Sequence, residues 1–210
     1  MKKDYKEYAE KALDDIFTAL EQIKAGEITV LTGENGTGKS LIRKVIGSEI
    51  ARQLDCDRVN VAATSMDLRS GINEWGSAEN AFVRDMEWLA TSQNSLNNIN
   101  GILRGPKNRY VVLDEPEIGM GLNLQASVGE LLKLKLPEIL KENLGVMVIT
   151  HSKEIVRRLS GTSNFVNIQG LSEEEWLNQT PYAIDLDEFQ EKSNALRKLL
   201  SKHLKKSQQS

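Results

Sequence analysis

A glycine-rich segment, Gly33-Glu-Asn-Gly-Thr-Gly-Lys39-Ser40, restricts the folds open to this chain more than any other feature of it. The segment fits the pattern G-x-x-x-x-G-K-[ST], in which glycines let successive backbone N–H groups point inward around a phosphate. An apolar run at 28–31 precedes it, and apolar residues at helical spacing follow it between 41 and 50. A strand, this loop and a helix in this order are the context that makes the match specific.

The segment predicts a nucleotide-binding loop, because the helix after it adds the positive end of its dipole to the inward-pointing amides. Lys39 would bring a mobile cation to the β- and γ-phosphates, and Ser40 an oxygen ligand for Mg²⁺. The residues that we expect to contact the nucleotide are Gly33, Glu34, Asn35, Gly36, Thr37, Gly38, Lys39, Ser40 and Leu41.

Two adjacent carboxylates end a second apolar run, Val111-Val-Leu-Asp114-Glu115-Pro116. At the end of a strand that leaves a sheet, Asp114 would help to hold Mg²⁺. Glu115 would lie near the γ-phosphate, where a carboxylate can orient the attacking water or accept its proton. Two solvated acids at a strand end are the alternative interpretation. The wholly apolar residues before them and Pro116 after them fit that alternative poorly.

His151 follows another apolar run, 146–150, within the sequence Thr-His-Ser. The carboxyl ends of parallel strands share one edge of a sheet, so His151 would lie on the edge that carries the glycine loop and the two acids. A lone histidine is more often structural than functional. The shared edge favours a functional role here, in which His151 senses the γ-phosphate by hydrogen bonding to it or to the water.

Strands alternate with helices along the chain, which predicts a doubly wound α/β domain, a mainly parallel sheet with helices on both faces. The strand candidates are 28–31, the continuous apolar runs 110–113 and 146–150, and 165–168, with a weaker one at 59–63. The helix candidates are 4–24, 41–50, 77–90, 95–103, 122–142 with Pro137 marking a kink or break, 173–178, and a helix from Leu186 onward. The polar segment 64–76, which contains glycines, is predicted to be a loop.

The chain of 210 residues has a net charge of −3, so it offers no overall attraction to nucleic acid or to an anionic membrane. Its one cysteine, Cys56, cannot form an intramolecular disulfide, which is consistent with a reducing compartment. The N-terminal residues lack the apolar stretch of a secretory signal, and no apolar run approaches the ~18 residues of a transmembrane helix. These features predict a soluble, cytoplasmic protein without direct membrane insertion.

The motifs, taken in order, resemble the ABC-type P-loop ATPase superfamily. The matching residues are Gly26-Glu-Ile before the loop, Asn35 within it, Leu-Asp-Glu-Pro at 113–116 and Thr-His-Ser at 150–152. The glutamate after the aspartate and the later histidine distinguish this superfamily from P-loop kinases and small GTPases. The segment Asp-Glu-Pro-Glu-Ile-Gly is more similar to the soluble branch of the superfamily than to transporter subunits. That branch includes recombination-repair, chromosome-maintenance and phage-defence ATPases. The resemblance implies an ATPase domain at 1–170, with a reduced helical region at about 64–105, and a helical extension at 171–210.

The chain departs from this family between its two main motifs. The interval from Lys39 to Asp114 is too short for the larger helical insert of transporter subunits or for long coiled-coil arms. Where the family has its dimer-forming signature, Leu-Ser-Gly-Gly-Gln, residues 90–96 read Ala-Thr-Ser-Gln-Asn-Ser-Leu. Ser92 and Ser95 could reach a partner's γ-phosphate, and an ordinary helix cap is an equally good interpretation.

The resemblance implies that this protein binds Mg-ATP, closes into an ATP-dependent head-to-tail homodimer and hydrolyses ATP at the interface. Lys39, Glu115 and His151 would be catalytic, with Ser40 and Asp114 as Mg²⁺ ligands. DNA processing, and with it contact with nucleic acid, follows from family association alone. One alternative is a regulatory or accessory subunit whose ATP state gates a protein partner and which hydrolyses little ATP by itself. An ABC transporter ATPase subunit is a third interpretation, which the short helical region disfavours.

Overall fold

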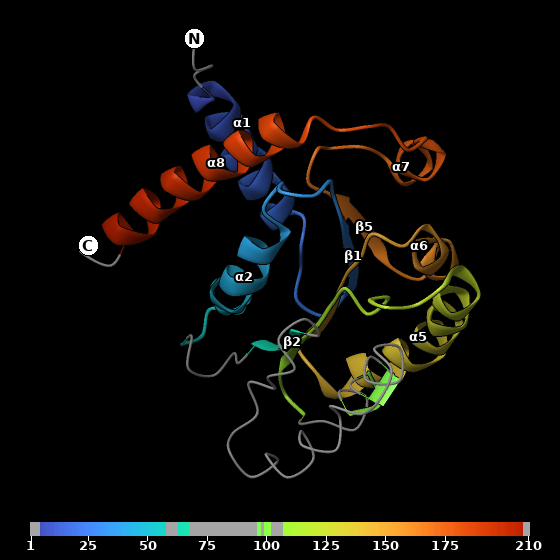
Figure 1. Ribbon diagram of the computed structural model, residues 1–210. Helices are drawn as coiled ribbons and strands as arrows, with labels where there is room; N and C mark the ends of the chain where they lie inside the picture. The colour runs from blue at the N-terminus through green and yellow to red at the C-terminus, as the bar shows by residue number, and fades with distance from the viewer. Residues whose placement is uncertain (1–4, 58–62, 68–95, 98, 102–106, 208–210) are drawn as a thin grey trace, which may run out of the picture.

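The structure, a computed structural model, describes residues 5–57, 63–67, 96–97, 99–101 and 107–207. At its centre is a sheet formed by β1 (Ile28–Thr32), β2 (Ala63–Asp67), β3 (Tyr110–Asp114), β4 (Gly145–Ile149) and β5 (Asn164–Asn167). The strands lie in the order β2-β3-β4-β1-β5, and each neighbouring pair is parallel. Helices cover both faces (Figure 1), so the predicted α/β class is confirmed.

Each face of the sheet has its own set of helices and its own hydrophobic cluster. α1 (Lys6–Glu21), α2 (Lys39–Gln53) and α8 (Leu186–Ser207) cover one face, and α5 (Leu122–Glu142), α6 (Lys153–Leu159) and α7 (Glu173–Asn178) cover the other. Successive residues of a strand point to opposite faces. In β3, Tyr110 and Val112 therefore pack under α1 and α2, whereas Val111 and Leu113 pack under α5.

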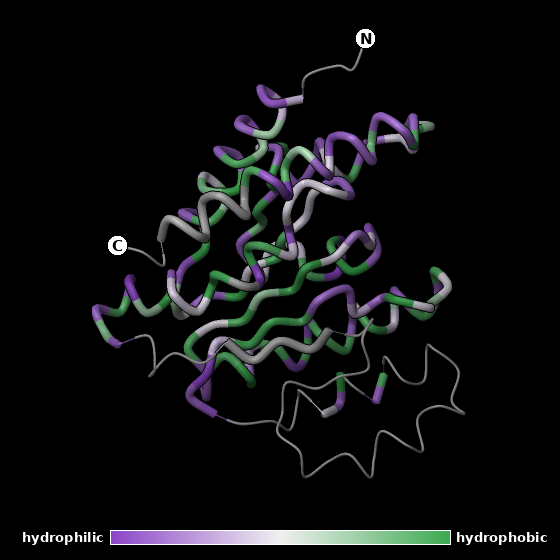
Figure 2. Tube along the Cα trace, turned by 60° about the vertical axis from the view of Figure 1, so that its left-hand side comes forward, coloured by the Kyte–Doolittle hydropathy of each residue, from purple (hydrophilic) through white to green (hydrophobic). Residues whose placement is uncertain are grey.

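Coverage on both faces explains why three strands read as continuous apolar runs. All five residues of β1, β3 and β4 are buried, as is typical of the inner strands of a parallel sheet. Figure 2 shows these strands as a hydrophobic layer between amphipathic helices. The predicted strands at 28–31, 110–113 and 146–150 are thereby confirmed to within one residue at their ends.

The edge strand β2 corrects one prediction from the sequence and leaves another untested. The weak candidate at 59–63 falls outside the described residues except for Ala63, and the strand continues to Asp67 through a segment that was predicted to be a loop. Within the described part of the sheet, β2 pairs with β3 alone. An edge strand does not need the continuous apolar run of an inner strand, and Ala-Thr-Ser-Met-Asp has none.

Two helices also differ from the prediction. α5 continues through Pro137 to Glu142, so the predicted break is wrong. Pro137 and Lys133, whose carbonyl loses its helical donor, are both exposed, so water can take the donor's place. α6 was not predicted, because its 7 residues are too few to show a clear apolar period. The helix candidate 77–90 lies outside the described residues, whereas 96–97 and 99–101 are helical as predicted.

α8 packs against α1, although the two helices lie at opposite ends of the sequence (Figure 1). Leu196 of α8 is buried in the same cluster as Ile16 of α1 and Ile42 of α2. Residues of the extension proposed at 171–210 therefore share the core of the domain. No helix in the described ranges is both long enough and apolar enough to cross a membrane.

Candidate functional site

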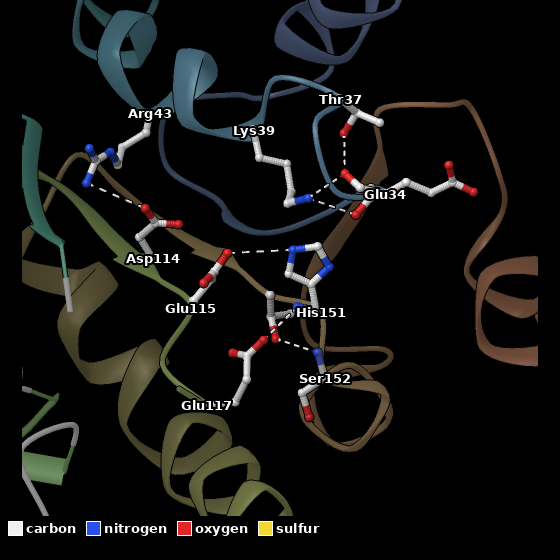
Figure 3. A network of polar contacts seen from close by, with 11 residues as sticks. Glu34, Thr37, Lys39, Arg43, Asp114, Glu115, Glu117, His151 and Ser152 are labelled. Atoms are coloured by element: carbon white, nitrogen blue, oxygen red, sulfur yellow. Dashed lines mark hydrogen bonds and ion pairs between the residues drawn. The ribbon is translucent and has the colours of Figure 1, made fainter. Parts of the chain in front are cut away.

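The sheet topology brings the ends of three strands together. β4 lies between β1 and β3 and pairs with both, so His151 lies between the loop after β1 and the acids after β3. Figure 3 shows the side chains of Lys39, Glu115 and His151 converging. They belong to one pocket of about 620 Å³, lined by Asn35, Gly36, Gly38, Lys39, Ser40, Asp114, Glu115, His151, Phe189, Ser193, Leu196 and Arg197.

The loop between β1 and α2 encloses the ammonium group of Lys39. Lys39 Nζ donates hydrogen bonds to the carbonyl oxygens of Gly33 and Glu34, each at 2.8 Å, and the residue is only 7% exposed. The loop takes left-handed backbone at Gly36 and Gly38, with φ of 80° and 101°, where a side chain would be strained. The ammonium therefore already lies inside the loop, where phosphate oxygens can replace the two carbonyls.

The remaining predicted loop residues divide between the pocket and the core. Asn35, Gly36 and Ser40 line the pocket. Thr37 is buried, and its hydroxyl donates to a carbonyl within the loop at 2.8 Å. Leu41 packs against the hydrophobic cluster under α1. The side chains of Thr37 and Leu41 therefore support the loop, and their backbone N–H groups donate to Glu34 O and Gly38 O.

Asp114 and Ser40 offer the pocket two oxygen ligands for a cation. Asp114 ends β3 and is 9% exposed. Arg43, one turn beyond Lys39 on α2, holds it from one side, with Nη1 3.5 Å from Asp114 Oδ2. Sequence reasoning missed Arg43. Among the described residues, no group of three or more His, Cys, Asp and Glu side chains could hold a metal. One carboxylate and one hydroxyl suit Mg²⁺, which takes waters and phosphate oxygens as its other ligands.

Glu115 has a strained backbone that aims its side chain at His151. Its φ of 49° is left-handed, which is unusual for glutamate, and Pro116 restricts it further. The Glu115 N–H donates to Ile149 O at 2.8 Å, which ties this conformation to the end of β4. Glu115 Oε1 lies 3.6 Å from His151 Nε2, too far for a direct hydrogen bond. Within the described part of the chain, His151 Nε2 is buried without a hydrogen-bond partner, which indicates a position for a ligand oxygen.

Three neighbouring strands thus end in a phosphate-type loop, an acid pair and a histidine, and the strand of the histidine lies between the other two. The resemblance of the motifs implies this shared edge. The fold is a parallel α/β sheet with helices on both faces and a phosphate-type loop after β1. The pocket lies where the carboxyl ends of the strands meet, which is the usual ligand position in parallel α/β sheets.

No protein-family model and no curated protein matches the sequence. A similar solved structure is cbiO1 from Clostridium perfringens, part of the ABC transporter complex cbiONQ, with 18% identity over 63% of this chain and 70% of that one and a TM-score of 0.40. A dimeric ATP-binding cassette in a post-hydrolysis state, bound to ADP and Pi, has 15% identity over 63% of this chain and 78% of that one, with a TM-score of 0.39. A nucleotide-free ATP-binding cassette from an ABC transporter has 16% identity over 69% of this chain and 78% of that one, with a TM-score of 0.39. Scores this low decide neither activity nor partners.

Glu117 is a third acid near the pocket, which sequence reasoning missed although it stands in the same Asp-Glu-Pro-Glu segment. Its Oε1 accepts a hydrogen bond of 2.6 Å from the His151 N–H, so it fixes the backbone that carries the histidine (Figure 3). Its Oε2 is buried and has no hydrogen-bond partner among the described residues. Burial raises the pKa of the Glu117 carboxyl above its usual 4.5, although the bond from His151 lowers it in part.

We predict from this raised pKa that Glu117→Gln changes how stability depends on pH. The folded state holds the proton of Glu117 more tightly than the unfolded state does, so the wild type loses stability as pH rises from about 4.5 through the folded-state pKa. Glutamine keeps an acceptor for the His151 N–H and does not titrate. The free energy of unfolding of Glu117→Gln, relative to wild type, should therefore increase between pH 5 and 7.5 in urea titrations.

The matched control is Glu138→Gln, which removes the carboxylate of an exposed glutamate on α5. The free energy of unfolding of Glu138→Gln, relative to wild type, should change less between pH 5 and 7.5. A difference that stays constant with pH for Glu117→Gln would show that the burial of this carboxyl does not affect its titration.

Sequence reasoning also missed the part that α8 plays in the pocket. Phe189, Ser193 and Arg197 line it together with the phosphate-type loop, and no local pattern connects residues so far apart in the sequence. Ser92 and Ser95, the predicted signature serines, lie outside the described residues. Their contact with a partner's γ-phosphate stays a prediction.

Proposed function

We propose that this chain binds Mg-ATP in the pocket at the ends of β1, β3 and β4 and hydrolyses it. The observation that carries the proposal is the convergence of Lys39, Glu115 and His151 on one pocket. Phosphoanhydride hydrolysis needs a cation for the phosphates, a group that orients or deprotonates water, and donors for the charge that develops. The pocket offers one residue for each of these roles.

The loop and the start of α2 would bind the triphosphate. Lys39 Nζ would exchange its bonds to the carbonyls of Gly33 and Glu34 for bonds to phosphate oxygens. Ser40 and Asp114 would hold Mg²⁺, which when bound neutralises charge on the phosphates. Because the loop amides and Lys39 are already in place, they can stabilise the charge that spreads over the γ-phosphate oxygens without reorganisation.

Glu115 and His151 would act on the attacking water and the γ-phosphate. Backbone strain such as that at Glu115 costs about 1–3 kcal/mol and is concentrated at functional sites, which supports a role in the reaction for this residue. Glu115 would accept the proton of the water. His151 Nε2, which lies 3.6 Å from Glu115 Oε1, would hydrogen-bond the same water or a γ-phosphate oxygen.

A second copy of the chain is part of this proposal. An ATP-dependent head-to-tail homodimer follows from the resemblance to ABC-type ATPases, in which the opposite subunit completes each site. A cytoplasmic location and a task in DNA processing rest on the same resemblance. The alternative remains a regulatory subunit that binds ATP, hydrolyses little of it and gates a protein partner.

The experiment that tests the proposal measures phosphate release from ATP by the wild-type chain, with Mg²⁺ and after its removal by EDTA. We expect turnover that stops without Mg²⁺. Asp114→Asn should lower the rate of phosphate release at least about 10-fold. Even substitutions of residues that only contact the ligands of a metal cause a loss of this size. Asp57→Asn, at an exposed aspartate outside the pocket, is the control and should keep wild-type turnover. Tight ATP binding without phosphate release would contradict hydrolysis and favour the regulatory alternative.

A further inference from the structure

α8 passes close over the phosphate-type loop. A Cβ placed on Gly36 would lie 2.9 Å from Ser193 Oγ and 3.0 Å from Phe189 Cε2. These distances leave no room for a side chain at Gly36, so the absence of a Cβ there lets the loop and α8 approach each other. α8 therefore forms part of the wall of the pocket that Asp114 and Glu115 also line.

Several contacts hold α8 in this position. Leu196 is 3% exposed and belongs to the hydrophobic cluster under α1. Lys192 Nζ lies 5.1 Å from the centroid of the Tyr8 ring on α1. Just before α8, the Tyr182 hydroxyl donates to Glu34 Oε1 of the loop at 2.6 Å. The residues that α8 presents to the pocket are thus positioned by the core.

The face of α8 toward the pocket carries a cation. Residues 189, 193 and 197 recur at four-residue spacing and so share one face of the helix. Among the residues that line the pocket, Lys39 and Arg197 are cationic, and Asp114 and Glu115 are anionic. A magnesium nucleoside triphosphate keeps a net negative charge, and without Arg197 the pocket lining would offer it one cation beside two carboxylates. The planar guanidinium also matches phosphate oxygens, which it can contact through two N–H groups at once.

We propose that α8 completes the nucleotide site within the same chain, with Arg197 contacting the phosphates of the bound nucleotide and Ser193 donating a hydrogen bond to them. The proposal rests on the proposed binding of Mg-ATP in this pocket, but neither on hydrolysis nor on a second copy. In the ABC-type arrangement a serine from the opposite subunit would reach the γ-phosphate. Here Ser193 and Arg197 approach the loop from the chain's own C-terminal helix.

The test compares the affinity of full-length variants for Mg-ATP by calorimetry. A hydrogen bond to a charged group contributes about 1.5–3 kcal/mol, so Arg197→Ala should bind Mg-ATP about 10- to 100-fold more weakly. Arg197→Lys should recover part of this loss. Lys198→Ala removes the same charge from the next residue of α8, which is exposed and does not line the pocket, and should bind like wild type.

Thermal unfolding separates binding from folding. Without nucleotide, a cooperative unfolding transition shows that Arg197→Ala and Lys198→Ala are both folded, and Mg-ATP should raise the unfolding temperature of Arg197→Ala less than that of Lys198→Ala. If Arg197→Ala and Lys198→Ala bind Mg-ATP equally while Lys39→Met loses binding, this inference is overturned and the proposed function stands. If the wild type does not bind Mg-ATP, the proposed function and this inference both fail.

Discussion

Replacing Glu115 by glutamine is expected to slow ATP hydrolysis by a factor of about 10²–10⁴, the range that a positioned general base contributes. Glutamine keeps the size of the side chain but cannot accept the proton of the attacking water. In the proposed site the loop and Lys39 would bind the phosphates, so the affinity for Mg-ATP should change little. Single-turnover phosphate release would give the rate, and calorimetry the affinity.

The variant also tests the proposed second copy, because ATP would persist in its site. Light scattering with Mg-ATP should then show twice the mass of the free chain, and without nucleotide a monomer. Glu138→Gln, at an exposed glutamate on α5, should keep the wild-type rate. A Glu115→Gln variant that turns over ATP at the wild-type rate would refute the assignment of Glu115 as the base. A mass that does not change with nucleotide would refute the homodimer.

The sequence predicted the inner strands and the positions of their functional residues because two physical constraints act locally there. Strands buried on both faces are mainly apolar, and β1, β3 and β4 are buried along their whole length. The carboxyl ends of parallel strands share an edge, which brings Lys39, Glu115 and His151 together once the strands are known. The pattern of a few residues was therefore enough to predict the pocket, although not its atomic contacts.

Other features depend on tertiary contacts that a local pattern does not record. The polar strand β2 forms because β3 offers it hydrogen bonds at the edge of the sheet. Glu117 was missed because its role, accepting a bond from the His151 N–H, requires two loops to meet. The approach of Ser193 and Phe189 to Gly36 joins segments from opposite ends of the chain. In each case the sequence shows the residue but not its neighbour.

Lys39→Met is expected to weaken the binding of Mg-ATP by about 10²–10³-fold. Lys39 Nζ donates two hydrogen bonds to loop carbonyls, those of Gly33 and Glu34, and two phosphate oxygens can take their place. Two charge-assisted bonds at about 1.5–3 kcal/mol each correspond to that loss in affinity or more. Methionine fills the volume of the aliphatic stem, so the fold should persist. Calorimetry with Mg-ATP would measure the change.

Lys133→Met is the matched control, because Lys133 is exposed on α5, outside the pocket. It should bind Mg-ATP like the wild type. Thermal unfolding without nucleotide should show that both variants are folded, so that weak binding by Lys39→Met reports the lost cation. Affinity at the wild-type level in a folded Lys39→Met would mean that nucleotide binds without the loop lysine. The glycine-rich segment would then be a structural turn between β1 and α2, because a phosphate site in this loop depends on its one buried ammonium.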